Sequence, residues 1–176
     1  PRLQMGGVTI HDGAGRAALS LDRVDAEVGW SSLLRMRLRL HRLEIDSPQL
    51  AIRRGADGQV FVAGLPVVAG GDQGDFTAWL LDQRQVVVRN ARVAWSDALR
   101  GADTLVLDKL EFRLDNRGDH HRFGLRAQPP GQLAAALDLR GDLIGRDAAH
   151  PETWRGELYA SLDYADMGAW RAWVDY

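Results

Sequence analysis

The chain has 176 residues, of which 45% are hydrophobic and 26% charged, and it carries a formal net charge of −2 at pH 7. A domain of this length buries roughly 70% of its unfolded surface, so a sizeable core or a lined groove is possible. The near-neutral charge gives no general attraction to nucleic acid, and we expect no nucleic-acid partner. The chain has no cysteine, which excludes disulfides, zinc–thiolate sites and a cysteine nucleophile.

No stretch approaches the roughly 18 consecutive apolar residues of a membrane-spanning helix, and no signal peptide is recognisable. The chain opens at Pro1 instead of an initiator methionine. We therefore expect it to be a segment of a longer protein.

Alternation of apolar and polar residues with a period of two dominates the chain. In LLRMRLRL, residues 33–40, every second side chain from Leu34 onward is leucine or methionine, and those between are arginine. Successive side chains of a strand point to opposite faces, so this segment is expected to be a strand with one apolar side. The same pattern predicts strands at 18–28, 50–53, 59–62, 86–95, 104–114, 122–127, 132–141 and 156–164.

Turn-forming residues separate these predicted strands. Asp12-Gly13, Asp57-Gly58 and the cluster at 116–119 each lie between two strand patterns, as hairpin loops do. The apolar alternation also changes phase twice, between Leu40 and Leu43 and between Leu107 and Leu110. Such phase changes predict β-bulges or bends.

Two segments have helical spacing instead. In residues 75–85, Asp75 can cap a helix whose Phe76, Trp79 and Leu80 share one face, and residues 165–174 carry a similar stripe. The predicted fold is mostly β, a long antiparallel curved sheet with two short amphipathic helices. We expect one β-rich unit, with a first strand set at 1–65, a loop and helix at 66–85, a second strand set at 86–164 and a terminal helix at 165–176. Only 66–85 is long enough for a parallel crossover.

Two short stretches resemble each other without carrying chemical groups. SPQLAIRR at 47–54 and NARVAWSD at 90–97 share a turn former, an alternating apolar core and a polar end. The resemblance indicates a repeated structural unit instead of an active site.

Candidate catalytic and metal motifs have simpler explanations. GAGRAA at 13–18 fits a dinucleotide fingerprint, but a strand pattern follows it where the fingerprint needs a helix. His120 and His121 are adjacent and would point to opposite faces of a strand, so we interpret them as a polar hairpin tip. We expect no catalytic residues, no metal and no cofactor.

The arginine stripe of 33–40 has two explanations. Arg35, Arg37 and Arg39 could pair with acidic residues of the preceding strand, or they could contact anionic lipid head groups. The sequence leaves both open.

The apolar side of such a sheet must be covered. Closing the sheet on itself would give a sandwich or barrel, whereas an open, curved sheet would form a trough able to hold acyl chains. Composition does not distinguish these two arrangements.

The segment RVDAEVGWSSLLRMRLRLHRLEIDSPQLAIRRGADGQVFVAGL, residues 23–65, resembles the amino-terminal part of the AsmA-like envelope proteins of the YhdP family. Residues 75–97, 121–143 and 154–174 are similar to later blocks of that family, in the same order. The resemblance implies a periplasmic segment of a protein anchored in the inner membrane. It also implies stacked β-repeats whose hydrophobic groove carries phospholipid towards the outer membrane, with neighbouring repeats and envelope proteins as partners.

Under this interpretation, the inward strand positions are the candidate groove lining, although each could equally be a core residue. They are Met36, Leu38, Leu40, Leu50, Ile52, Val60, Val62, Val93, Trp95, Leu105, Leu107, Phe112, Leu114, Phe123, Leu125, Leu137, Leu139, Leu158 and Leu162. Two alternatives remain: a structural or assembly module with a closed core, and an envelope hydrolase that uses scattered carboxylates.

Overall fold

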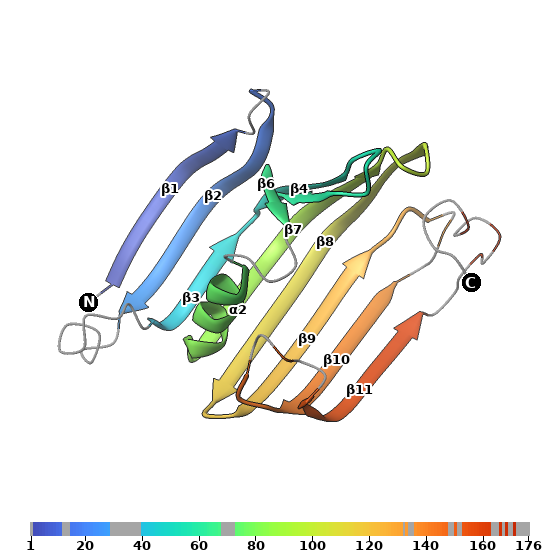
Figure 1. Cartoon of the computed structure of the whole chain (residues 1–176). Coiled ribbons are helices and arrows are strands. Elements are labelled where there is room, and N and C mark those ends of the chain that lie inside the picture. Colours follow the sequence, from blue (N-terminus) through green and yellow to red (C-terminus); the bar gives the residue numbers. More distant parts are fainter. Residues whose placement is uncertain are drawn as a thin grey trace.

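Among the described residues, one curved sheet of eleven strands makes up most of the structure (Figure 1). The computed structural model describes residues 2–11, 15–28, 40–67, 73–131, 133, 136–147, 150, 153–162, 166, 168 and 171. The strands are β1 (Arg2–His11), β2 (Ala17–Val28), β3 (Leu40–Asp46), β4 (Gln49–Arg54), β5 (Val60–Val62), β6 (Leu65–Val67), β7 (Gln85–Asp97), β8 (Ala102–Arg117), β9 (His120–Gln128), β10 (Leu137–Ile144) and β11 (Arg155–Leu162). Helix α2 (Gln73–Asp82) lies between β6 and β7.

The strand order combines two antiparallel meanders with one parallel junction. Strands β7 to β11 follow one another antiparallel, as do β1, β2 and β3. At the junction, β3 and β4 both pair with β7 in parallel. The parallel crossover includes the segment with α2, which is where the length of the connection predicted one. The prediction of a mostly β, curved sheet is also confirmed.

The predicted helices and turns have different outcomes. Helix α2 confirms the first predicted helix, although it begins at Gln73 and ends at Asp82. The second predicted helix, at 165–176, is not confirmed, since most of it lies outside the described residues. Also outside them are the Asp12-Gly13 turn and five predicted site residues: Arg35, Met36, Arg37, Leu38 and Arg39.

The two phase changes in the sequence correspond to bulges. At the first, Glu27 pairs with Arg42 and Val28 with Leu40, so His41 is an extra residue in β3. At the second, Lys109 in β8 has a φ of 48° and the pairing with β9 shifts. A bulge adds one residue to one strand, which restores the apolar side chains to the same face after the slip.

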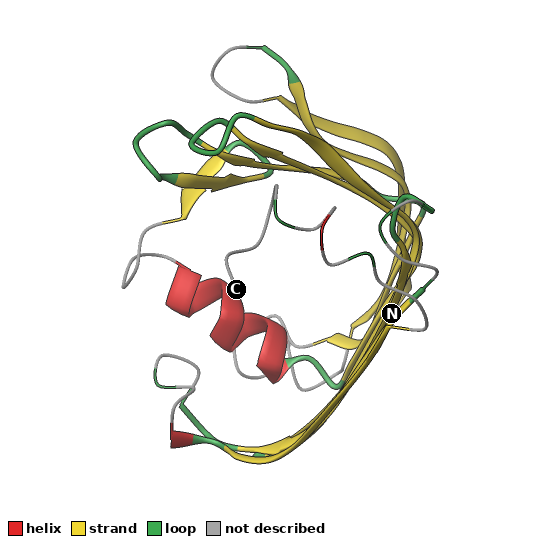
Figure 2. Ribbon diagram, turned by 90° about the vertical axis from the view of Figure 1, so that its right-hand side faces the viewer, coloured by secondary structure: helices red, strands yellow, loops and turns green. Residues whose placement is uncertain are grey.

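The apolar face is the concave side of the sheet. Seen edge-on, the sheet curves around α2 (Figure 2). Trp79, Leu80 and Leu81 of α2 pack against one buried cluster of the sheet. That cluster comprises Val24, Ala26, Leu40, Leu43, Val86 and Leu114. A second cluster, further along β7, β8 and β9, comprises Ala91, Leu110 and Ala127.

Candidate functional site

The candidate groove residues within the described part differ in their burial. Leu40, Leu105 and Leu114 are buried and form part of the core, whereas Leu158 and Leu162 at the edge are exposed. The remaining candidates are half-buried, namely Leu50, Ile52, Val60, Val62, Val93, Trp95, Leu107, Phe112, Phe123, Leu125, Leu137 and Leu139. The structure therefore places the described candidates on one sheet, but their solvent exposure ranges from buried to exposed.

Strand register shows which of these side chains share a face. Leu139 lies opposite Leu125 on β9 and Ala160 on β11, while Leu137 lies opposite Ala127 and Leu162. Directly opposed residues point to the same side of a sheet, so these positions form an apolar surface across three strands. We call the concave surface of β9, β10 and β11 the edge strip.

Gly141 shapes the middle of the edge strip. It lies opposite Phe123 on one side and Leu158 on the other. A Cβ atom added at Gly141 would overlap the Phe123 ring and lie 2.8 Å from its Cδ1 atom. Only glycine leaves room for this ring to lie across β10, and the ring in turn reaches the cluster under α2.

The edge strip ends in solvent. Leu158 is 73% exposed and Leu162 is 45% exposed, although both are large hydrophobic residues. Contiguous exposed apolar surface of this kind marks a binding site for an apolar ligand or a partner more often than a single exposed leucine does.

The convex face of the same strands carries charged side chains. Arg140 donates to Asp138 over 2.7 Å, and Arg126 donates to the same carboxylate over 3.0 Å. The hydrogen bond from Arg140, supported by that from Arg126, lowers the pKa of Asp138 to about 2. Asp138 therefore remains ionised throughout the physiological pH range.

A second group of charges follows on the convex face. Asp142 contacts His120 and accepts a hydrogen bond of 2.7 Å from Arg122. The hydrogen bond with His120 is the main cause that lowers the pKa of Asp142, and Arg122 contributes further. Arg122, Arg126 and Arg140 are therefore each paired with an acid.

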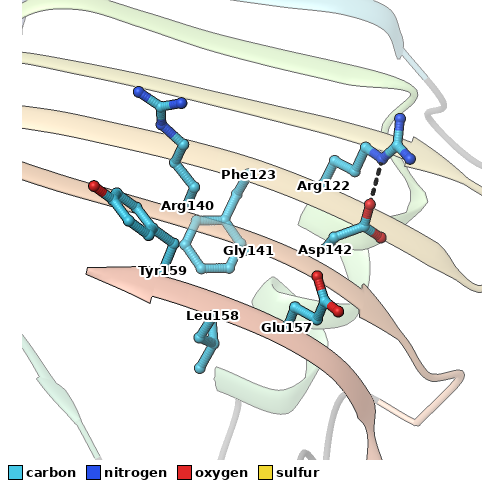
Figure 3. A pocket seen from close by; sticks show the side chains of 8 residues that line it. All are labelled: Arg122, Phe123, Arg140, Gly141, Asp142, Glu157, Leu158 and Tyr159. Atoms are coloured by element: carbon cyan, nitrogen blue, oxygen red, sulfur yellow. Dashed lines mark hydrogen bonds and ion pairs between the residues drawn. The ribbon is translucent and has the colours of Figure 1, made fainter. Parts of the chain in front are cut away.

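A shallow pocket of about 620 Å³ lies at this end of the sheet (Figure 3). Its lining combines the Arg122–Asp142 pair, Arg140 and Tyr159 with Phe123 and Leu158. The guanidinium of Arg140 lies 5.8 Å from the centre of the Tyr159 ring, a cation–π contact. Tyr159 and Leu158 point to opposite sides of β11, so the pocket borders the edge strip without forming a closed cavity.

A buried polar network holds the end of α2 to the sheet. Asn116 of β8 donates from Nδ2 to the carbonyl oxygens of Gln83 over 2.7 Å and of Leu80 over 3.2 Å. Gln83, which is fully buried, accepts a hydrogen bond of 2.7 Å from the backbone N–H of Leu40 through Oε1. Carbonyls at a helix C-terminus lack intrahelical donors, and this network supplies hydrogen-bond donors to them.

His121 belongs to the same network, which corrects the prediction of a polar hairpin tip. His121 is only 4% exposed, and its ring stacks on Trp154 at a centroid distance of 4.9 Å. Its two ring nitrogens contact Oδ1 of Asn116 and the carbonyl oxygen of Gly145. His120 and His121 do point to opposite faces, as strand geometry requires, and no acidic or histidine cluster suited to a metal occurs among the described residues.

Neither Gln83 nor Asn116 stands out in the sequence. The local pattern places Asn116 in a turn, and Gln83 follows the predicted helix without any distinguishing pattern. Their burial depends on how α2 lies across the sheet, which local periodicity does not specify.

The model of the YhdP protein family matches residues 1–175 of the chain. The chain belongs to the YhdP family. A search of curated proteins found no match. YhdP proteins are proteins of the cell envelope, and within its described ranges the chain has no helix long and apolar enough to cross a membrane.

Proposed function

We propose that this YhdP segment forms part of a periplasmic conduit that carries phospholipid between the inner and outer membranes. The observation that carries the proposal is the exposed edge strip, where Leu158 and Leu162 remain in solvent on an otherwise apolar concave surface. Each acyl CH₂ group removed from water contributes roughly 0.8 kcal/mol, so an apolar surface is sufficient for binding. The parent protein would be anchored in the inner membrane.

The proposed role is not enzymatic. Moving a lipid along an apolar surface makes and breaks no covalent bond, so it needs no nucleophile, metal or cofactor. A passive surface accelerates the approach to equilibrium but sets no direction, so net flow would depend on a source of free energy elsewhere.

The open edges of the sheet support a conduit longer than this chain. Among the described strands, β1 pairs with β2 alone and β11 pairs with β10 alone. Each therefore leaves one row of backbone donors and acceptors available for another strand. We expect neighbouring β-repeats of the parent chain to continue the sheet there, and other envelope proteins to be partners at its ends.

A second candidate function is a structural or assembly module of the envelope with a closed core. The packing of α2 on β2, β3, β7 and β8 favours it, because that part of the concave face is already covered.

Native mass spectrometry of the full-length protein, followed by lipid extraction, separates the two. Phospholipid that copurifies in a defined ratio supports the conduit. Protein that is free of lipid and takes up none from vesicles would support the structural module instead.

A further inference from the structure

Helix α2 divides the concave face into covered and uncovered parts. Trp79, Leu80 and Leu81 pack over the cluster that includes Leu43, which is 9% exposed. Beyond the helix, Trp154 stacks on His121 at the start of β9, but Leu158 of β11 is 73% exposed. An incoming ligand would therefore find exposed apolar side chains on the edge strip, whereas those beneath α2 are already covered.

The attachment of α2 is built from buried hydrogen bonds at its C-terminal end. Asn116 holds two carbonyls of this end, and Gln83 binds the backbone N–H of Leu40. The backbone adds a bond of 3.1 Å from the N–H of Arg84 to the carbonyl of Leu40. A buried polar group left without a partner costs roughly 1–3 kcal/mol, so lifting α2 would carry several such costs together with the exposed apolar area.

The edge strip has dimensions suited to an acyl chain. Strands β10 and β11 have eight residues each, which at about 3.3 Å per residue span roughly 26 Å. One leaflet of a bilayer's hydrocarbon core is about 15 Å thick, so one acyl chain could lie along a strand within the strip. At the opposite margin, β1 also exposes Leu3 and Met5, which are followed by Gly6 and Gly7.

We infer that α2 is a fixed partition on the concave face, and that phospholipid acyl chains bind beside it on the edge strip instead of beneath it. This inference rests on the proposed function and specifies its binding surface. It assigns Leu139, Leu158 and Leu162 to lipid contact, and Leu43 and Val24 to the protein core.

Site-specific photocrosslinking in the full-length protein tests the inference. A diazirine analogue of leucine, which preserves side-chain size, is placed at position 158, 43 or 159, and the protein is irradiated with vesicles of radiolabelled phosphatidylethanolamine and phosphatidylglycerol. Position 159 lies on the convex side of the same strand and reports nonspecific labelling. We expect at least tenfold more lipid adduct at position 158 than at positions 43 and 159.

The other outcomes have distinct meanings. Adduct at position 43 equal to that at position 158 would overturn the partition while retaining lipid binding. If lipid adduct at positions 158 and 43 does not exceed the level at position 159, the proposed function is overturned as well. In Asn116→Ala, which removes the donor to the carbonyls of Leu80 in α2 and of Gln83 just after it, we expect adduct at position 43 to increase and lipid transfer not to rise. A rise in transfer would show that α2 is a gate and would contradict a fixed partition.

Discussion

The side-chain amide of Asn90 donates a hydrogen bond of 3.2 Å to the hydroxyl of Ser47, 43 residues earlier, and both residues have a φ of 51°. The parallel pairing of β3 and β4 with β7 keeps the same offset throughout, from Leu43 opposite Val86 to Arg54 opposite Asp97. The two similar stretches of sequence are therefore neighbouring strands in register. The bond joins the two positions at which both strands bend.

Asn90 is expected to be sensitive to substitution by β-branched residues. A left-handed backbone costs an ordinary residue about 1–2 kcal/mol, which asparagine and glycine largely avoid. Asn90→Val should therefore lower local stability by about 1–2 kcal/mol relative to Asn90→Gly. Both variants lose the bond to Ser47, so their difference isolates the backbone. Native-state hydrogen exchange of β7 measures it, and equal exchange in the two variants would contradict the assignment.

Gly141→Ala is expected to disturb the edge strip. Its new methyl group would collide with the Phe123 ring, and overpacking of this kind costs about 1–3 kcal/mol. Gly124→Ala on β9 is the matched control, because nothing lies within 4 Å of an added Cβ there. Hydrogen exchange in β9 and β10 should increase in Gly141→Ala and stay near wild type in Gly124→Ala. Introducing Gly141→Ala into a Phe123→Ala background should cost much less.

Gln83→Met is expected to loosen the attachment of α2. The substitution retains side-chain length but leaves the N–H of Leu40 without its acceptor, a loss of about 1–3 kcal/mol. Gln59→Met, at an exposed position, should change stability little. The measurement is exchange of the Leu40 and Arg84 amides. If Gln83→Met leaves both amides as protected as in wild type, the buried network does not hold the helix.

Acid should weaken the convex face through Asp138. Its pKa falls from 3.8 to about 2 on folding, so its contribution to stability is complete above the higher value and is lost as the pH falls towards the lower one. Between about pH 5 and pH 2, Asp138→Asn should therefore lose less stability in β9 and β10 than wild type. Asp22→Asn, an exposed acid on β2, serves as the control. Identical pH profiles for wild type and Asp138→Asn would contradict this role.

Local patterning predicted most of the strands, although not β1 or β6, and also their apolar side and the bulges at His41 and Lys109, because a period of two is a property of neighbouring residues. It did not predict that β3 and β4 pair with β7 in parallel, since that pairing joins segments 43 residues apart. Local patterning likewise predicted both Leu40 and Leu158 as groove-lining residues. Helix α2 buries Leu40, while Leu158 on the edge strand remains exposed.

The most direct test of lipid carriage compares two adjacent residues on one exposed strand. Leu158 faces the concave side and Tyr159 the convex side of β11, and both are more than half exposed. Each is replaced by arginine in the full-length protein, and phospholipid transfer between donor and acceptor vesicles is measured. Because an arginine on the edge strip would place a charge in the acyl path, Leu158→Arg should reduce transfer at least tenfold while Tyr159→Arg stays within twofold of wild type. Equal transfer by the two variants would contradict the proposal that the concave face carries lipid.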